Sequence, residues 1–364
     1  MEYPTSALTF CKANESDFES LVRCIAKVLI DGNSMHAHTY TMDKWLWKYF
    51  RMPHAEPRIY ICKQGQEILG YYHCAVYRGV LDGELVKIAM VQDVGMSEVA
   101  RGKGVFSKLA VYATNDLLHS DIQFSYTFPN EKSIHTFIKY NGYDSIDVLM
   151  SFVIPIQFDL ILASKFKFFG LEKRMGQLLN RLFSLFIPKV DHRIRVTQSE
   201  VLTEQMIDVF LDFNKRFANT LIRDENYLKW RYVDKPQGKY YFFCAYEGTE
   251  LNAVAIISIE DLLGVKAAVI MDFAIREAQE AAFVQMIVQI RNNDSVFFNE
   301  SIGLLYSSTI RTNEFVFKKA GFIKIPQRWN PRPLNLLGRS LKSKVKTSMD
   351  PLKWNITLSD WDVL

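Results

Sequence analysis

Apolar residues recur at steps of three and four near the start of the chain and again beyond its midpoint. They are Phe18, Leu21, Ile25 and Leu29 in the first stretch and Leu202, Met206, Val209, Phe213 and Phe217 in the second. Both stretches predict amphipathic helices that bury one face. A capping box formed by Ser16 and Glu19 predicts the start of the first helix.

The same aromatic pattern follows each predicted helix at a constant distance. The segment 47–53, Trp-Lys-Tyr followed by Pro, recurs as Trp-Arg-Tyr followed by Pro at 230–236, an offset of 183 residues. Further along, the offset drops to 179, where Asp93 aligns with Asp272. A hairpin that is four residues shorter in the second copy explains the change. The chain is therefore predicted to contain two related units, each an α/β layer built around a mixed sheet.

The composition agrees with two globular domains. The 364 residues are 49% hydrophobic and 23% charged, which argues against disorder. Five cysteines without a Cys-x-x-Cys pair fit a reducing compartment. No apolar run reaches the ~18 residues that span a membrane, and the first residues lack the plan of a signal peptide, so we expect a cytoplasmic protein. The net charge of +4 is too small to indicate nucleic-acid binding.

A glycine-rich segment connects a predicted strand to a predicted helix in the first copy. The strand Val91–Met96 leads into Arg101-Gly102-Lys103-Gly104, and Val105 and Phe106 open the helix. A helix N-terminus presents free N–H groups and a positive dipole end to anions, and glycine permits close approach. The segment is predicted to cradle a pyrophosphate. It is neither a Walker loop nor a dinucleotide fingerprint, because the Gly-Lys-Ser/Thr and the third glycine are missing.

This segment resembles the GNAT superfamily of acyl-CoA N-acyltransferases, whose motif Gln/Arg-x-x-Gly-x-Gly/Ala follows the fourth strand. Arg101 and Gly104 match the motif, whereas Phe106 stands where a small residue is usual. Asn130 and the Gly142-Tyr143 pair resemble the family's next strand and helix. The resemblance covers the first copy well and the second weakly. It implies an α/β fold (α+β in some schemes) of two tandem domains, each a mixed, mostly antiparallel sheet flanked by helices.

The resemblance also implies a co-substrate, acetyl-CoA, and its binding residues. In that family the pantetheine arm pairs with the backbone of the fourth strand, and the glycine loop holds the pyrophosphate. The implied cofactor-binding residues are Val94, Gly95, Met96, Arg101, Gly102, Lys103, Gly104, Val105, Phe106, Asn130 and Ser133. No metal is expected, because His36 and His38 form an alternate pair without a third ligand, which is more typical of a polar loop.

Acyl transfer to an amine needs a group that takes a proton and a group that protonates the thiolate. Asp93 is the candidate base, because relatives often carry an acidic residue at this point of the strand that faces the thioester. Asp272 at the matching position of the second copy equally supports a purely structural role. The tyrosine that relatives often use as the acid is replaced by Ile138, so either Tyr126 or solvent is expected to supply the proton.

The second copy lacks the phosphate loop. At the 179 offset, Glu280–Phe283 replaces Arg101–Gly104, so this copy is not expected to bind acyl-CoA. The predicted divisions are an N-terminal domain at 1–157, a basic amphipathic linker at 158–192, a degenerate C-terminal domain at 193–330 and a basic extension at 331–364.

These features predict an acetyl-CoA-dependent N-acetyltransferase that acts, through its N-terminal domain, on a primary amine of a small molecule or amino sugar, as a monomer or homodimer. One alternative is a non-catalytic acyl-CoA-binding or regulatory protein, which the missing tyrosine and Phe106 favour. Another is an acyltransferase that acts at a membrane surface on a lipid-linked saccharide, with peripheral membrane contact through residues 158–190. Docking of that segment on a domain is the favoured interpretation over membrane contact.

Overall fold

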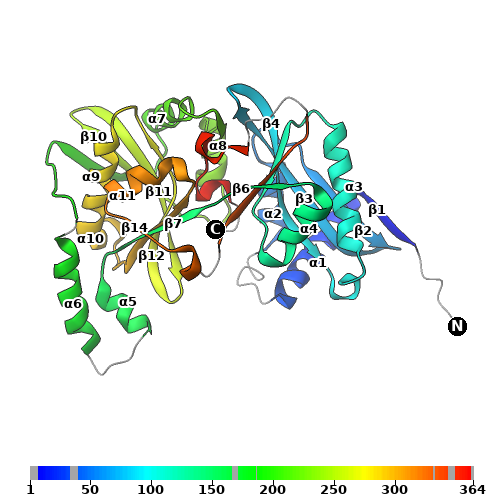
Figure 1. Ribbon diagram of the computed structural model, residues 1–364, viewed down its shortest axis with the longest axis horizontal. Helices are drawn as coiled ribbons and strands as arrows, with labels where there is room; N and C mark the ends of the chain where they lie inside the picture. Colours follow the sequence, from blue (N-terminus) through cyan, green and yellow to red (C-terminus); the bar gives the residue numbers. More distant parts are fainter. Residues whose placement is uncertain are drawn as a thin grey trace. The chain divides into compact units, whose positions relative to one another are not determined.

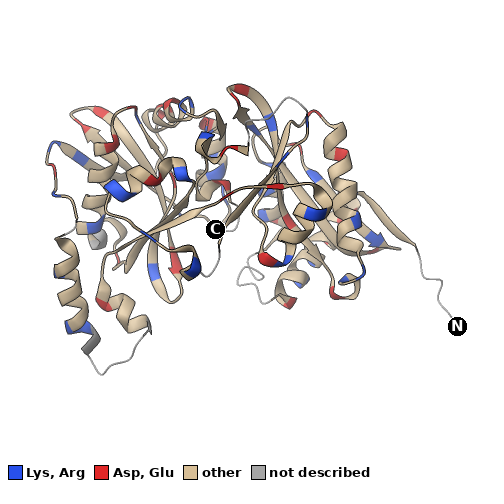
Figure 2. Ribbon diagram, viewed as in Figure 1, with Lys and Arg blue, Asp and Glu red and all other residues tan. Residues whose placement is uncertain are grey.

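The computed structural model describes residues 7–32, 40–165, 171–185, 187–330, 333–342 and 349–361. They form two compact units, which we describe separately (Figure 1). Unit 1 consists of Met1–Asp147, Asp234–Pro236 and Leu334–Asp350, and unit 2 consists of Val148–Val233, Gln237–Pro333 and Pro351–Leu364. Figure 2 shows Lys and Arg interspersed with Asp and Glu along the elements of both units.

Unit 1 is built on a mixed sheet with the strand order β1-β2-β3-β4-β5-β15-β6. The pairs from β1 to β4 are antiparallel, as is β5 with β15, whereas β4 and β5 run parallel. Its elements are β1 (Leu8–Lys12), α1 (Phe18–Asp31), α2 (Met42–Phe50), β2 (Arg58–Gln64), β3 (Glu67–Leu81), β4 (Glu84–Met96), α3 (Val105–His119), β5 (Phe124–Thr127), α4 (Glu131–Asn141), β6 (Asp144–Val148) and β15 (Asn335–Ser340).

Helices cover both faces of this sheet. The predicted stripe of α1 is buried against β3 and β4, with Leu21 and Ile25 almost fully enclosed. On the other face, α3 packs against β2 and β3. The capping box is formed by Asn14 and Asp17, and not by the predicted Ser16 and Glu19, because a short 3-10 turn at Glu15–Asp17 precedes α1.

Unit 2 repeats this plan with the strand order β14-β7-β13-β12-β11-β10-β8, in which only β12 and β13 are parallel. Its elements are β7 (Met150–Pro155), α5 (Phe158–Lys165), α6 (Leu171–Ser184), β8 (Ile194–Ser199), α7 (Glu204–Asn214), β9 (Asn219–Leu221), α8 (Glu225–Leu228), β10 (Tyr241–Glu247), β11 (Glu250–Leu262), β12 (Val265–Ile275), α9 (Glu280–Asn292), α10 (Asp294–Phe298), β13 (Leu304–Thr309), α11 (Glu314–Lys319), β14 (Ile323–Lys324) and β16 (Trp354–Asn355).

The central hairpins account for the change of offset between the copies. β3 and β4 have 15 and 13 residues, whereas β11 and β12 have 13 and 11. Both hairpins turn through two residues with positive φ, Asp82-Gly83 and Leu263-Gly264, as a tight hairpin turn requires. The second hairpin is therefore four residues shorter, as the sequence predicts.

Each unit also contains a strand from outside its own sequence copy. β7 directly follows the first copy but pairs with β13 in the sheet of unit 2. β15 follows the second copy but pairs with β5 in unit 1. The segment 331–364 is therefore more than a basic extension: Leu337 and Trp354 are at most 1% exposed, each in a different unit.

The segment between the copies contains two helices, α5 and α6. Asn180 of α6 accepts a hydrogen bond from the backbone of Phe158, and Phe183 packs edge-on against the same phenylalanine. Leu178 and Leu182 remain at least half exposed. Among the described residues, no helix is long and apolar enough to cross a membrane.

Candidate acyl-transfer site

The two parallel strands at the centre of unit 1 separate partway along their length. β4 pairs with β5 only from Ile88 to Val91, and from Gln92 to Met96 it pairs with β3 alone. The hydroxyl of Thr127, the last residue of β5, donates to the carbonyl of Val91 at 3.0 Å, where the strands part. Beyond this point one edge of β4 has backbone groups that no strand uses.

The predicted phosphate loop lies at the end of β4, in the turn that starts α3. Gly102 and Gly104 have φ of 73° and 68°, and a Cβ at either would meet no atom within 4 Å. The turn is exposed, and Arg101 is held by a hydrogen bond from Nε to the Met96 carbonyl at 3.2 Å. The first N–H groups of α3 have no partner within the helix, so the turn has the geometry that an anion site requires.

The other predicted cofactor residues divide into two groups. Val105 is buried and Phe106 packs toward the Tyr72 ring, so these two can reach a ligand only through their backbone N–H groups. Val94 and Met96 likewise pack against the core, and β4 presents its backbone at these positions. Phe106, which departs from the family motif, therefore packs its ring against the core.

Asn130 and Ser133 lie at the start of α4, just after β5 ends. The Asn130 side-chain oxygen caps the helix by accepting from the backbone N–H groups of Lys132 and Ser133 and from the Ser133 hydroxyl. The side chain of Asn130 is exposed, and that of Ser133 is partly buried. Asn130 therefore has a structural role as the cap of α4. Its side-chain amide nitrogen is not used by this cap and could contact a ligand.

Asp93 is the extra residue of a β-bulge in β4. Tyr72 pairs with Val94 and His73 with Gln92, which leaves Asp93 unpaired with a φ of 43°. A bulge of this kind turns the side chain out of the strand's normal alternation.

Three side chains donate to one oxygen of this carboxylate. Tyr40, Lys48 and Tyr49 reach Asp93 Oδ2 at 2.7, 2.7 and 2.8 Å. No donor from the described residues reaches Oδ1, and the side chain is 21% exposed. Burial raises the pKa of Asp93, but the charge of Lys48 and the hydrogen bonds from Lys48 and Tyr40 together with His73 outweigh burial and lower the pKa to about 2. The carboxylate therefore stays ionised at neutral pH and keeps one oxygen open.

Sequence reasoning missed most of the groups around Asp93, because they come from α2, from the segment before it and from β3. Trp45 and Tyr49 are fully buried, but the Tyr49 hydroxyl also belongs to the site. His73 has no exposure and both ring nitrogens lack a partner; burial lowers its pKa to about 3. The signal that could have found Tyr49 is its recurrence as Tyr232.

Tyr126, the candidate acid, lies on the part of β5 that still pairs with β4, opposite Met90. Its side chain is 1% exposed and its ring meets Phe128 edge-on at 5.9 Å. The structure thus places Tyr126 before the point where the strands separate, whereas Asp93 lies after it.

In unit 2 the corresponding strands also separate, but the end of the chain occupies the gap. β12 pairs with β13 only up to Val269 and Tyr306. The carbonyl of Ile356 then accepts from the Thr309 hydroxyl at 2.7 Å and from the backbone of Ile310 at 3.3 Å. A short 3-10 turn at Leu358–Asp360 contacts both β12 and β13. We call residues 354–361 the C-terminal plug.

Asp272 is bound to this plug. Its carboxylate accepts from Thr357 at 3.0 Å, from Ser359 at 2.9 Å and from Arg223 at 2.6 Å, and all these residues are buried. Arg223 also pairs with Asp360 at 2.6 Å. Burial would lower the pKa of Arg223, but the two carboxylates raise it well above its usual range, so the cation is permanent.

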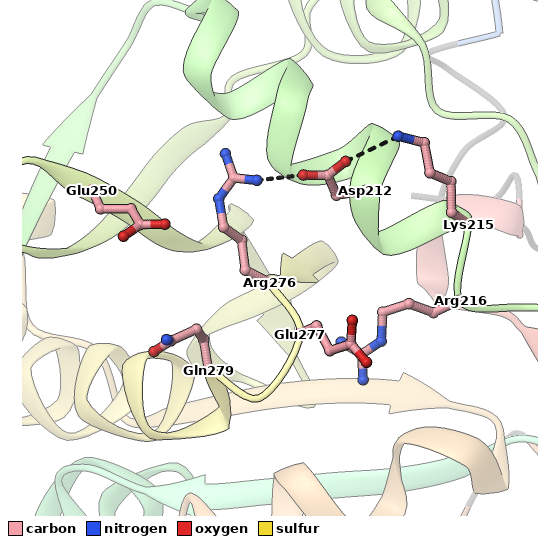
Figure 3. A pocket seen from close by; sticks show the side chains of 7 residues that line it. All are labelled: Asp212, Lys215, Arg216, Glu250, Arg276, Glu277 and Gln279. Atoms are coloured by element: carbon pink, nitrogen blue, oxygen red, sulfur yellow. Dashed lines mark hydrogen bonds and ion pairs between the residues drawn. The ribbon is translucent and has the colours of Figure 1, made fainter.

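The phosphate turn has no counterpart in unit 2. Glu280–Phe283 forms the first turn of α9, and Ala282 and Phe283 are buried. Nearby, a cavity of about 580 Å³ is lined by side chains of both charges (Figure 3). These are Asp212, Lys215, Arg216, Glu250, Arg276, Glu277 and Gln279. Asp212 pairs with both Lys215 and Arg276, so this cavity lacks the excess positive charge that a pyrophosphate would need.

No group of three or more potential metal-binding His, Cys, Asp or Glu side chains occurs in the described part of the chain, and His36 and His38 lie outside it. The site of unit 1 consists of separated parallel strands, an open glycine turn at a helix N-terminus and a bulged strand with a carboxylate. Such an arrangement brings N–H donors for an anion and an ionised carboxylate to the same end of β4.

The comparison with models of protein families agrees with the resemblance found in the sequence of unit 1. Residues 10–144 match the model described as an acetyltransferase (GNAT) domain. The match is confined to these residues of unit 1, where it agrees with the resemblance to the GNAT superfamily that the sequence motifs indicate. No curated protein matches the sequence significantly.

Solved structures share the fold over nearly the whole chain. A probable N-acyltransferase from Enterococcus faecalis V583 has a TM-score of 0.64 at 12% identity, over 92% of this chain and 73% of its own. Saccharomyces cerevisiae N-myristoyltransferase with bound myristoyl-CoA has a TM-score of 0.60 at 11% identity, over 92% and 82%. A tandem GNAT protein from the clavulanic acid biosynthesis pathway has a TM-score of 0.58 at 12% identity, over 92% and 99%. The fold class predicted from the sequence, two tandem GNAT-like domains, is thereby confirmed.

Proposed function

We propose that unit 1 transfers an acetyl group from acetyl-CoA to a primary amine of a small molecule or amino sugar. The observation that carries this proposal is the open gap between β4 and β5 beside an unobstructed glycine turn, in contrast to the plugged gap of unit 2. The pyrophosphate would lie on the N–H groups of 102–106, because the N–H of Arg101 already donates to the carbonyl of Glu98, and the pantetheine arm would pair with the free edge of β4 at Val94–Met96.

Asp93 is placed to hold the amine. Its free Oδ1 can accept a hydrogen bond from the attacking nitrogen, which becomes positively charged as the C–N bond forms. Because its pKa is about 2, Asp93 is a weak base. We therefore propose that it orients the neutral amine and stabilises the charge, while water takes the proton. The C–S bond breaks, and CoA leaves as a thiolate.

The test is to follow release of free CoA thiol with acyl-CoA donors of increasing chain length against a panel of primary amines, and to identify the product by mass spectrometry. We expect acetyl-CoA and at least one small amine to give a new amide. Thiol release by the wild-type chain that disappears in Gly104→Glu would locate the reaction in unit 1. If CoA binds tightly but no amine in a broad panel is acylated, the protein is a binding module.

A further inference from the structure

One face of α6 holds this helix against the rest of unit 2. Gly176 approaches α5 so closely that a Cβ there would collide with the backbone of Asp159. On the same side, Phe183 meets Phe158 edge-on, and the guanidinium of Arg291 from α9 lies over the Phe183 ring at 5.7 Å. The helix is therefore fixed in place by contacts along one side.

A second face of α6 is apolar and exposed. Its side chains recur at steps of three and four, and their exposed fractions run from 39% to 78%. They are Met175, Leu178, Leu182 and Leu185. Figure 1 shows α6 beside α5 at the edge of unit 2. Single exposed apolar side chains are common on protein surfaces, whereas a continuous stripe of this kind marks an interaction surface.

Basic side chains border this apolar stripe. Lys173, Arg174 and Arg181 are exposed and form no ion pair with another residue that the structure describes. Because an α-helix has about 3.6 residues per turn, Arg174 and Arg181 lie two turns apart on the same side of the stripe. Residues 171–185 contain these three basic residues and one acidic residue, Glu172. The exposed surface of α6 is therefore apolar along its middle and positive along its margin.

This distribution of charge decides which partner fits. Pairing of the stripe with a second copy of the chain would bring arginines close to arginines, without carboxylates to neutralise them. An anionic lipid surface supplies both matching parts, because its acyl chains can bury the leucines and its headgroups can pair with the arginines. Arginine can lay its methylene groups along apolar surface while its charge reaches the headgroups.

We propose that α6 binds unit 2 to an anionic membrane surface, with Leu178 and Leu182 inserted between the lipids. The helix lies in the plane of the interface, since its 14 residues are about 21 Å long and too short to cross a hydrocarbon core of about 30 Å. This inference goes beyond the proposed function of unit 1 and does not rest on it.

The experiment is co-sedimentation of the full chain with vesicles of phosphatidylcholine, either alone or mixed with phosphatidylglycerol. We expect binding to the anionic vesicles only, and weaker binding at high salt, because salt screens the attraction. Leu178→Ser combined with Leu182→Ser should lower vesicle affinity about 10-fold or more, since the apolar burial is lost. Arg174→Gln combined with Arg181→Gln should lower it about 30-fold, which is about fivefold for each charge.

The matched control is Val201→Ser combined with Val296→Ser. Both valines are highly exposed in unit 2 and lie outside α6, so this variant should bind vesicles like the wild type. All the substituted side chains are exposed, and an unchanged melting temperature confirms that each variant is folded.

Three results would overturn the proposal. They are no binding to anionic vesicles, equal binding to both kinds of vesicle, and the same affinity in the leucine variant as in the control. A dimer that forms without lipid and disappears in the leucine variant would assign the stripe to a second copy of the chain and would also overturn it. Vesicle binding is measured without acyl-CoA or an amine, so its failure leaves the proposed function of unit 1 intact.

Discussion

Asp93 and Asp272 occupy matching positions in the central strands of the two units, yet their surroundings differ. Asp93 receives three donors on one oxygen and leaves the other open, with 21% of the side chain exposed. Asp272 accepts on both oxygens and is fully enclosed. In each unit a tyrosine of the repeated motif donates to the aspartate, Tyr49 in one and Tyr232 in the other.

The comparison of the two aspartates distinguishes the contacts that both units have from those that only one unit has. The tyrosine–aspartate pair is common to both units, so it stabilises the central strand whether or not a ligand binds. The difference lies in what occupies the gap between the strands. In unit 2 the C-terminal plug fills it and supplies Thr357 and Ser359, whereas in unit 1 Oδ1 of Asp93 has no donor from the described residues. An intact phosphate turn accompanies the gap of unit 1 alone.

The largest expected effect concerns stability. Asp272→Ala should lower the free energy of unfolding by about 3–5 kcal/mol, because it removes one of the two carboxylates that pair with the buried Arg223 and an acceptor for the plug. Asp93→Ala should cost less, about 1–2 kcal/mol, because its partly exposed position lets water reach the Lys48 ammonium. Urea unfolding followed by tryptophan fluorescence measures both. Equal losses would contradict the contrast between a closed and an open carboxylate.

The second prediction concerns the phosphate turn. Gly104→Glu should weaken CoA binding by about 100-fold or more, since it adds negative charge and bulk at the anion site. Gly248→Glu is the matched control in unit 2: Gly248 also has a positive φ of 61° and open space around its Cβ. It should lose similar stability but keep CoA affinity. Calorimetry that finds CoA affinity unchanged in Gly104→Glu rules out the turn as the binding site.

Much of this architecture could be predicted from the sequence because it depends on local pattern. The offset repeat located Asp93 opposite Asp272 and anticipated the shorter hairpin, and the two glycines of the turn identified the start of α3. The pairing of β7 could not be predicted, because its apolar residues indicate a strand without specifying which sheet receives it.

Contacts between side chains from distant parts of the chain could not be predicted from the sequence pattern either. Lys48 lies on α2, 45 residues from Asp93, and no spacing rule relates them. The plug carries no motif, and its role follows only from the contacts of Thr357 and Ser359 with Asp272. The candidate base therefore came from the sequence, whereas the low pKa that makes Asp93 a poor base came from the tertiary structure.

The third prediction tests how Asp93 acts. Asp93→Asn should lower kcat by about 10- to 100-fold, because an uncharged amide stabilises the ammonium less, while CoA affinity stays the same. Since the pKa of Asp93 is lowered to about 2, its charge is lost only as pH falls from about 4 through 2. The loss of rate should therefore be the same factor at pH 6 and pH 9. A defect that disappears at one end of this range would instead indicate that Asp93 accepts the proton.

The smallest expected effect concerns Asn130, whose counterpart in unit 2 is Ile310, a residue without a side-chain cap. Asn130→Ala should cost about 1 kcal/mol of stability, because α4 loses the acceptor for the N–H groups of Lys132 and Ser133. Asn130→Asp keeps that acceptor but removes the amide nitrogen. If the nitrogen contacts the cofactor, Asn130→Asp should weaken CoA binding several-fold, and the variant should melt at the wild-type temperature. If CoA affinity stays at the wild-type value, Asn130 only caps the helix. The pair of variants thus tells whether α4 has a cofactor role or, like α11 in unit 2, serves the fold alone.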